Sequence, residues 1–373
     1  MEKALTVVQI LPALEAGGVE RCTLETARAL VAAGHRSLVI SNGGRLTPQL
    51  LREGSEHITL PVHRKSLRSL FQIHPLRRLL AELQPDILHA RSRVPAWIAW
   101  LAWRGLPPES RPHFVTTVHG LHSVSAYSAI MVKGEAVIAG SDTVRRYILE
   151  NYPQCPPERI RLIPEGVDPA EFPYNYQPSP EWLTQWRKDF PQLAGKTTLA
   201  LPGRLTRLKG HATFIALIEK LRQEFPDVQG LIIGGAEASK AAYANELRAA
   251  VQQRGLESCI TFTGHRGDMR DVFSQCHLVY SLSTQPETFG RTVLEAIRLG
   301  RPVIGWDMGG VGDILRECYP RGRIPAHDET ALLAQSRAWL RDPDQPPPNP
   351  HFLLETMCRQ TLALYETLAR AAP

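Results

Sequence analysis

The stretch HLVYSLSTQPETFGRTVLEAIRLG at residues 277–300 joins an apolar strand, a short polar loop and an amphipathic helix. The same order recurs along the whole chain, where short β-branched runs alternate with longer helical patterns. This alternation is typical of stacked βαβ units in an α/β fold. The predicted strands are 5–10, 37–41, 87–90, 114–118, 136–139 and 160–163 in the first half, and 198–201, 230–233, 259–262, 277–280 and 302–305 in the second.

A proline-rich segment at 169–194 interrupts this rhythm and indicates a linker with an irregular helix. Two α/β halves on either side of such a hinge predict two Rossmann-like, doubly wound domains facing across a cleft. We expect the first domain at 1–170, the second at 171–345, and a closing segment at 346–373 that contains a helix at 352–370.

The composition is that of a soluble globular protein, with 43% hydrophobic and 21% charged residues. A formal net charge of +6 suits an anionic partner such as a sugar nucleotide, an acidic lipid surface or a nucleic acid, and charge alone does not choose among them. The cysteines stand singly without metal-binding spacing, which favours buried thiols in a reducing compartment. The first residues lack a signal-peptide pattern and no apolar run reaches about 18 residues. We therefore expect a cytoplasmic protein.

The loop and helix at 285–300 contain the strongest local signal. Gly290 would let the backbone approach a ligand, and the free N–H groups of Phe289 to Thr292 would point at an anion. Glu287 lies in the loop and Glu295 one turn inside the helix, so both carboxylates could face one pocket. The alternative is that Glu287 caps the helix and Glu295 is an exposed helix residue.

A second signal, ALPGRLTRLKGH at 200–211, leaves the first strand of the second half and enters a helix. The loop after such a strand is where doubly wound folds hold phosphate. Arg204 and Lys209 could neutralise a leaving diphosphate, whereas Arg207 is expected to face solvent. Alternatively, these basic residues form an ordinary hydrated loop.

Two weaker signals occur in the first half. The loop EAGGVER at 15–21 is glycine-rich, but it is not the GxGxxG of a dinucleotide site, which argues against an NAD oxidoreductase. His119 ends the strand TTVHG at the carboxyl edge, where α/β sheets collect functional groups. The alternative is that this lone histidine is structural.

Five features follow one another in an order that resembles glycosyltransferase family four. They are the GG loop after strand one, the VHG strand end, Gly166-Val-Asp168 before the hinge, the GRLTRLKGH loop and the Glu287-x7-Glu295 pair. The resemblance extends from about Thr6 to Leu340 and implies the GT-B fold and a retaining mechanism. It also implies that the final helix crosses back to the N-terminal domain.

The resemblance implies a role for each matching residue. Glu295 would hold the ribose hydroxyls of a nucleotide-sugar donor, and Glu287 the donor sugar. Arg204 and Lys209 would bind the diphosphate, and His119 would lie near the anomeric carbon. The remaining expected donor contacts are Gly17, Gly18, Gly264, His265, Phe289, Gly290, Arg291 and Thr292.

One position departs from the family pattern, because Glu165 stands where asparagine usually precedes Gly-Val-Asp. An acid there puts in doubt any hydrogen bond that the amide would donate. Glu287 and Glu295 would bind the donor rather than act as a glycosidase pair.

No DxD-like acidic pair lies at a predicted strand end as a Mg²⁺ ligand. We therefore expect a metal-independent reaction, with the nucleotide sugar as co-substrate and no other cofactor. The charge of the leaving diphosphate would fall to the basic residues and helix amides.

The acceptor is expected to bind the first domain, whose stretch 63–111 is rich in arginine. Its basic residues, against Glu82, Asp86 and Glu109 only, are Arg64, Lys65, Arg68, Arg77, Arg78, Arg91, Arg93, Arg104 and Arg111. Trp97, Trp100 and Trp103 lie among them at helical spacing. Such a surface could bind an anionic membrane or a phosphorylated glycolipid. Alternatively, the tryptophans form a buried helix face and the arginines a solvated rim.

Stretches such as HARSRVPAWIAWLAWRG and FVTTVHGLHSVSAYSAIM are similar to bacterial transferases of lipopolysaccharide-core and surface-glycan assembly. This similarity implies a membrane-associated acceptor, a protein peripheral on the inner face of the cytoplasmic membrane, and no nucleic-acid partner. The open alternatives are a sugar-nucleotide epimerase of the GT-B fold, a transferase to a soluble sugar, and a non-catalytic nucleotide-binding subunit. The intact acidic and basic motif residues argue against the last.

Overall fold

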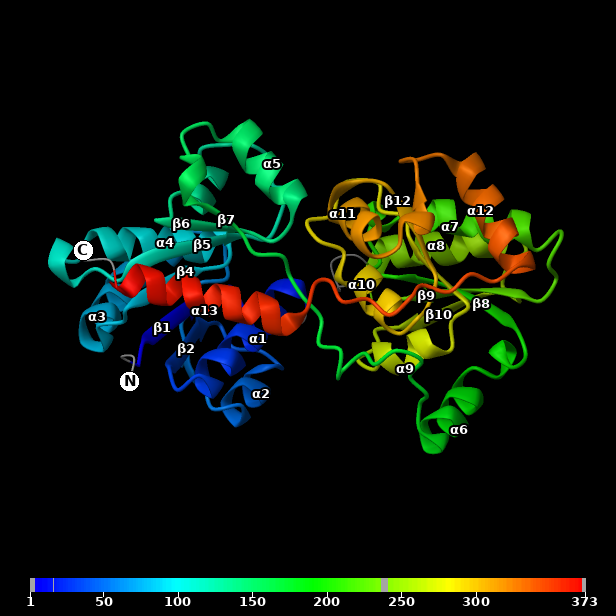
Figure 1. Ribbon diagram of the computed structural model, residues 1–373, viewed down its shortest axis with the longest axis horizontal. Helices are drawn as coiled ribbons and strands as arrows, with labels where there is room; N and C mark the ends of the chain where they lie inside the picture. Colours follow the sequence, from blue (N-terminus) through cyan, green and yellow to red (C-terminus); the bar gives the residue numbers. More distant parts are fainter. Residues whose placement is uncertain (1–3, 16, 236–240, 371–373) are drawn as a thin grey trace. The chain divides into compact units, whose positions relative to one another are not determined.

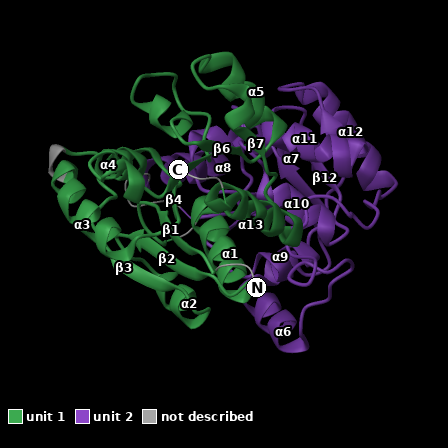
Figure 2. Ribbon diagram, turned by 60° about the vertical axis from the view of Figure 1, so that its left-hand side comes forward, with its two compact units in different colours: residues 1–166, 354–373 green, residues 167–353 purple. Residues whose placement is uncertain are grey.

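The computed structural model describes residues 4–15, 17–235 and 241–370. The chain divides into two compact units, drawn in different colours in Figure 2. Unit 1 comprises residues 1–166 and 354–373, and unit 2 comprises residues 167–353. Ala16 of the EAGGVER loop and the side chain of Arg68 lie outside the described residues.

The sheet of unit 1 contains β1 (Thr6–Ile10), β2 (Arg36–Ser41), β3 (Glu56–Thr59), β4 (Ile87–Ala90), β5 (His113–Val118), β6 (Ala136–Ala139) and β7 (Ile160–Leu162). Among the described residues these strands follow the order β3-β2-β1-β4-β5-β6-β7, and every neighbouring pair is parallel. The order reverses between β1 and β4, where Val7 pairs with both Ser37 and Ile87. β4 and β6 are buried along their whole length because helices cover both faces of the sheet.

The helices of unit 1 are α1 (Gly18–Ala32), α2 (Thr47–Arg52), α3 (Ile73–Leu83), α4 (Arg93–Arg104), α5 (Asp142–Asn151) and α13 (Leu354–Arg370). Short 3-10 segments are η1 (Leu67–Gln72), η2 (Pro108–Ser110), η3 (Ser128–Val132) and η4 (Pro157–Arg159). Val8 of β1 belongs to a cluster with α3 and α4, whereas Val7 belongs to one with α1 and α13. The last helix of the chain therefore packs on the first unit, beside α1 (Figure 1).

The sheet of unit 2 contains β8 (Thr197–Pro202), β9 (Val228–Ile233), β10 (Ile260–Gly264), β11 (Leu278–Ser281), β12 (Val303–Trp306) and β13 (Arg323–Ile324). In residues 167–235 and 241–353 these strands are parallel, in the order β10-β9-β8-β11-β12-β13. The order reverses between β8 and β11, which is the topological switch point where doubly wound sheets bind ligands.

The helices of unit 2 are α6 (Pro180–Asp189), α7 (His211–Leu221), α8 (Ala241–Gln253), α9 (Met269–Ser274), α10 (Arg291–Arg298), α11 (Gly309–Cys318) and α12 (Glu329–Arg341), with 3-10 segments η5 (Pro191–Leu193), η6 (Arg207–Lys209) and η8 (Pro320–Gly322). The proline-rich segment thus contains a regular helix, α6. Ser179 caps it by accepting the Trp182 N–H at 3.2 Å, and Pro180 occupies its first position.

The structure confirms the predicted α/β fold with two doubly wound sheets, and every predicted strand overlaps an observed one. The edge strands β3 and β13 were not predicted. In β3 exposed and half-buried positions mix, and β13 has two residues, so neither shows the apolar run of a buried strand. The cysteines are free and buried, as expected. In the part of the chain that the structure describes, no helix is long and apolar enough to span a membrane.

Candidate functional site

The loops that follow β8 and β11 are joined at the carboxyl ends of these two neighbouring strands. The Thr284 N–H donates to the Leu208 carbonyl at 2.8 Å. Gly210 makes the close approach feasible, because its φ is 73° and a Cβ there would stand 2.0 Å from the Leu282 carbonyl oxygen. At the switch point of unit 2 the two loops therefore contact each other, and position 210 requires glycine.

Lys209 and Glu287 meet between these two loops. Lys209 Nζ lies 2.8 Å from Glu287 Oε1, and the Ser283 hydroxyl donates to the same oxygen. The side chains are 25% and 24% exposed. Burial alone would raise the pKa of the Glu287 carboxyl, but the charge and hydrogen bond of Lys209, the Ser283 hydroxyl and the Arg204 charge together lower it below its usual value. At neutral pH the site therefore presents an ionised carboxylate beside a cation.

The two arginines of the β8 loop have different surroundings. Arg204 is exposed and lies close enough to Glu287 for its charge to lower the carboxyl pKa. Arg207 instead donates to Glu246 and lies 5.1 Å above the centre of the Tyr243 ring, with 72% of its side chain exposed. Arg204 and Lys209 thus act on Glu287, and Arg207 faces solvent as expected.

Two glycines at the start of α11 hold the backbone of the Glu287 loop. The Gly310 N–H donates to the Glu287 carbonyl at 2.8 Å. A Cβ at Gly309 would lie 2.7 Å from that carbonyl oxygen, and one at Gly310 would lie 2.4 Å from Phe289 Cα. These glycines were not among the expected site residues. The cluster MGGVG at 308–312, directly after a strand, is the signal that marks them.

The start of α10 follows Gly290, whose φ of 105° lies in the left-handed region. Phe289 is 3% exposed and packs edge-on against Phe352, with ring centres 5.7 Å apart. The Val293 N–H donates back to the Gly290 carbonyl at 2.9 Å. The N–H groups of Arg291 and Thr292 precede this bond and lie at the positive end of the helix dipole.

Glu295 is buried in the middle of α10, with 4% exposure. The Nε of Arg291, one turn earlier, donates to its Oε1 at 3.1 Å. The alternative that Glu295 is an exposed helix residue is therefore wrong. The ion pair fixes the direction of a carboxylate that can only accept hydrogen bonds.

Gly264 and His265 lie at the end of β10. Gly264 has a φ of 72°, and His265 follows it as an exposed residue. A Cβ at Gly235, after β9, would stand 3.2 Å from His265 Cβ, and the Gly235 carbonyl accepts the Leu205 N–H at 3.1 Å. The end of β9 thus links the 264–265 turn to the β8 loop.

In unit 1, Gly17 and Gly18 stand at the start of α1. Gly17 has a φ of 153°, and a Cβ there would lie 2.7 Å from a Glu20 carboxylate oxygen. A Cβ at Gly18 would meet no described atom within 4 Å. The backbone at Gly18 is therefore open on that side, as close approach of a ligand requires.

His119, directly after β5, is 7% exposed at its side chain. Its Nδ1 lies 3.5 Å from Glu165 Oε1, and its Nε2 lies 3.4 Å from an Arg91 Nη. Because a guanidinium can only donate, Nε2 is the acceptor and Nδ1 carries the hydrogen in the neutral ring. The Glu165 carboxylate thus faces the Nδ1 hydrogen of His119. This contact needs an acceptor at position 165, so the hydrogen bond that an asparagine amide would donate is not required.

Arg91 does not belong to the basic surface in which the sequence placed it. It is 3% exposed, and its guanidinium donates to Gln9 Oε1 at 2.8 Å, Thr26 Oγ1 at 3.0 Å and Cys22 Sγ at 3.3 Å. The prediction was wrong for this residue because β4 ends at the switch point of the sheet. Arg91 directly follows β4, and its side chain packs between β1 and α1.

The tryptophans of α4 lie partly buried against the core of unit 1. Trp97 donates from Nε1 to the Tyr127 carbonyl at 2.9 Å, and Trp103 donates to the Pro112 carbonyl at 2.7 Å. This packing agrees with the alternative of a buried helix face. Beside Trp97 lies an open groove of about 230 Å³, lined by Leu70, Val94, Ile98, Leu101 and Tyr127 together with Arg64, Lys65 and Ser66.

No group of three or more His, Cys, Asp or Glu side chains in the described ranges is arranged to hold a metal ion. Between the loops after β8 and β11, the Glu287 carboxylate lies near the cations of Lys209 and Arg204. A doubly wound sheet with such groups at its switch point is an arrangement typical of proteins that bind ligands with hydroxyl and phosphate groups.

Two family models cover most of the chain. The model described as Glycosyltransferase Family 4 matches residues 16–171, and that described as Glycosyl transferases group 1 matches residues 184–349. The chain belongs to glycosyltransferase family four.

Several known proteins are similar to this chain. The lipopolysaccharide core biosynthesis mannosyltransferase LpsB of Rhizobium meliloti is 26% identical over 325 residues, which cover 83% of this chain and 87% of LpsB. A D-inositol 3-phosphate glycosyltransferase of Stackebrandtia nassauensis is 24% identical over 265 residues, or 66% of this chain. The chain spans only 58% of the length of that relative.

Among solved structures, Anabaena Alr3699/HepE in complex with UDP-glucose superposes with a TM-score of 0.83 at 20% identity, covering 97% of this chain and 100% of that one. A glycosyltransferase of Rickettsia africae superposes with a TM-score of 0.82 over 99% of this chain and 100% of that one, at 25% identity. These likenesses confirm the GT-B fold.

Proposed function

We propose that the protein is a retaining glycosyltransferase that moves a hexose from a nucleoside-diphosphate sugar to a glycan or glycolipid acceptor. The observation that carries the proposal is the Lys209–Glu287 pair beside Arg204 at the unit 2 switch point. Family membership supports the reaction class. The relative in lipopolysaccharide-core synthesis supports a surface-glycan acceptor, and the UDP-glucose complex of a similar fold supports the class of donor.

Departure of a nucleoside diphosphate leaves negative charge on phosphate while the anomeric carbon becomes positive. Arg204 and Lys209 supply fixed positive charge for the phosphate, and the first amides of α10 add a helix amino end. A bound phosphate would share the Lys209 ammonium with Glu287. The Glu287 carboxylate could then accept hydrogen bonds from sugar hydroxyls.

The other expected roles agree with the chemistry of each side chain. Glu295, buried on α10, would accept hydrogen bonds from the ribose hydroxyls. His119, held by Arg91 and Glu165, would act near the anomeric carbon. Neither Glu287 nor Glu295 is assigned as a nucleophile, so retention would come from attack on the face that the diphosphate leaves.

The reaction is proposed to need no metal ion, because Arg204 and Lys209 supply the positive charge that a metal ion would otherwise contribute. Transfer that continues unchanged in excess EDTA would support this. Loss of transfer in EDTA with recovery on addition of Mg²⁺ would contradict it.

A thermal-shift screen with UDP-, GDP- and ADP-sugars tests the proposal first, because a ligand of the native state raises the melting temperature. We expect one nucleotide class to stabilise the protein, and Lys209→Ala to lose that stabilisation. NMR of the product should then show the anomeric configuration of the donor. An epimerised sugar nucleotide formed without acceptor would favour the epimerase alternative, and no stabilisation by any sugar nucleotide would contradict donor binding.

The acceptor is proposed to be lipid-linked, with the protein peripheral on the cytoplasmic face of an anionic membrane. The support is the group of packed elements η1, α3, α4 and η3. Their described acidic side chain is Glu82, whereas their described basic side chains are Arg77, Arg78, Arg93 and Arg104. Leu70, which lines the groove beside Trp97, is 47% exposed, and the next residue, Phe71, is 76% exposed. Exposed apolar side chains among basic ones suit acidic lipid headgroups.

Flotation with phosphatidylglycerol liposomes at low salt tests the membrane proposal. Phe71→Ser should reduce the floated fraction, because Phe71 is the most exposed of the apolar side chains that the structure describes on this surface. Leu51→Ser is the matched control, since Leu51 is 52% exposed on α2, away from the groove. Wild-type protein that stays unbound at low salt would leave a soluble acceptor as the remaining proposal.

A further inference from the structure

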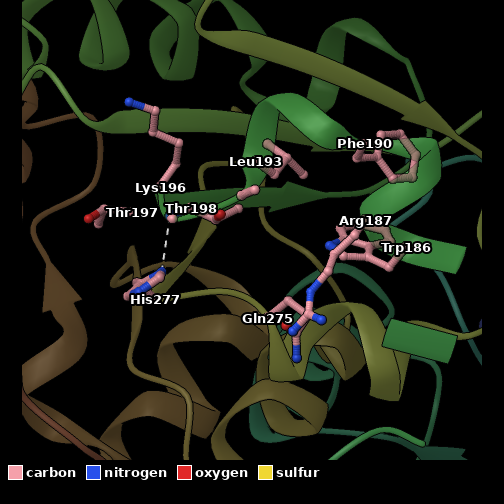
Figure 3. A pocket seen from close by; sticks show the side chains of 11 residues that line it. Trp186, Arg187, Phe190, Leu193, Lys196, Thr197, Thr198, Gln275 and His277 are labelled. Carbon is pink, nitrogen blue, oxygen red and sulfur yellow. Dashed lines mark hydrogen bonds between the residues drawn. The ribbon is translucent and has the colours of Figure 1, made fainter. Parts of the chain in front are cut away.

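A cavity of about 410 Å³ lies in unit 2 at the amino ends of β8 and β11. Figure 3 shows the side chains that line it. They come from α6 and η5, from the chain that links these segments to the start of β8, and from Gln275 and His277 before β11. The Lys209–Glu287 pair stands at the carboxyl ends of the same two strands. Because β8 is six residues long, about 20 Å of sheet separates the two places. The cavity is therefore distinct from the candidate donor site.

Two polar side chains that line this cavity, His277 and Arg187, present hydrogen-bond donors. The Thr198 N–H donates to Nδ1 of His277 at 3.0 Å (Figure 3). A backbone N–H cannot accept, so Nδ1 is unprotonated and the ring hydrogen of neutral His277 is on Nε2. His277 and Arg187 are both exposed to solvent at the cavity. Each therefore offers N–H groups to a molecule that enters.

Charge at the cavity is positive. Arg187 and Lys196 line it, and no aspartate or glutamate is among its described lining residues. Lys196 Nζ lies 2.5 Å from Asp227, which does not line the cavity, so the lysine charge is paired outside it. Arg187 is therefore the cation that favours an anion in the cavity.

Part of the cavity wall is apolar and closely packed. Trp186 is 6% exposed and Leu193 is 7% exposed, and Phe190 packs against Trp186 with ring centres 4.5 Å apart. Trp182 stacks on Trp186 at 5.1 Å, with 14° between the ring planes. Such a wall can hold a flat or apolar body without rearranging, and the cavity volume falls in the usual range for small-molecule sites.

We propose that this cavity binds a small organic phosphate, with its flat body against Trp186 and Phe190 and its phosphate toward Arg187 and His277. A guanidinium matches the geometry of phosphate oxygens, and the His277 N–H adds to this preference. The site goes beyond the proposed transfer reaction, because none of its residues belongs to the donor loops.

The test titrates the full chain with phenyl phosphate, followed by ligand-detected NMR. Phosphate could also bind at the donor loops, so all variants carry Lys209→Ala. Adding Arg187→Ala should weaken binding about tenfold or more, since a charged hydrogen-bond partner is lost. Adding Lys188→Ala is the matched control. Lys188 is exposed on the same helix but does not line the cavity, and affinity there should change less than about twofold.

Two further probes test whether the ring and the phosphate of the ligand each contribute to its affinity. Benzyl alcohol, which lacks the phosphate, and inorganic phosphate, which lacks the ring, should both bind more weakly than phenyl phosphate. The proposal is overturned if Arg187→Ala and Lys188→Ala give the same affinity, if Lys209→Ala alone abolishes binding, or if benzyl alcohol binds as tightly. Sugar transfer does not enter this measurement, so its outcome is independent of the proposed function.

Discussion

Both sheets reverse their strand order beside a basic residue, which is Arg91 after β4 in unit 1 and Lys209 after β8 in unit 2. Arg91 is 3% exposed and donates to three side chains of β1 and α1. Lys209 is 25% exposed and pairs with Glu287. A buried guanidinium with several internal acceptors stabilises its surroundings. A partly exposed ion pair can exchange part of its contact for a ligand. A basic residue beside the switch point thus serves structure in unit 1 and, in the proposed function, binding in unit 2.

The largest expected effect is on activity, from Lys209→Ala. If Lys209 stabilises the leaving diphosphate as proposed, loss of its positive charge should lower transfer on the order of 10³-fold, with little change in melting temperature. Release of nucleoside diphosphate is the measurement. Arg207→Ala, in the same loop but paired with Glu246, should stay within about twofold of wild type. Equal losses in the two variants would show that the loop, not the Lys209 charge, is what matters.

The next effect is on stability, from Arg91→Met. Methionine fills part of the space but leaves the Gln9 and Thr26 oxygens without their donor, which should cost about 3 kcal/mol of unfolding free energy. Urea denaturation measures it. Arg78→Met on the exposed side of α3 is the control and should change stability by less than about 0.5 kcal/mol. A stable Arg91→Met protein would contradict the structural role of Arg91.

A third prediction separates the stability cost of backbone strain from that of a steric clash at the switch point of unit 2. Gly210→Ala should destabilise the protein by about 2 kcal/mol or more, because the left-handed φ of 73° is combined with a clash at the Leu282 carbonyl. Gly255→Ala has a similar φ of 63° but no described atom within 4 Å of the new Cβ, so it should cost only about 1 kcal/mol. Thermal denaturation gives both values. Equal costs would mean that the two loops can move apart.

The smallest effect concerns pH. The folded state holds the pKa of Glu287 below its ordinary value, so this group adds stability above its unfolded pKa of about 4.3. That contribution is lost as pH falls through the lower folded value. The stability difference between wild type and Glu287→Gln should therefore be constant from about pH 7 to 5 and change against wild type below about pH 4. A difference independent of pH would contradict the lowered pKa.

The unit 2 site was largely predictable because its residues follow apolar strands directly. Lys209 and Glu287 each lie in a loop after such a run, and the doubly wound strand order brings those loops together. Their roles in catalysis stay predictions. The burial of Arg91 was not predictable from arginine content, because it depends on partners 82 and 65 residues away in sequence.

The contribution of Gly309 and Gly310 was also missed, for a related reason. They act on the Glu287 loop only because α11 begins directly behind it, which is a property of the folded sheet. A glycine cluster after a strand indicates a close approach, but it does not say which segment approaches.

The position of α13 has a consequence for how the protein folds while it is being synthesised. Tyr365 of this helix lies 2.6 Å from His89 Nδ1, across 276 residues of sequence, and α13 covers apolar residues of β1 in the core of unit 1. Unit 2 is contiguous in sequence, whereas unit 1 lacks one of its covering helices until residues 354–370 have been made. On the ribosome, the half of the protein that emerges first would therefore be the last to become complete.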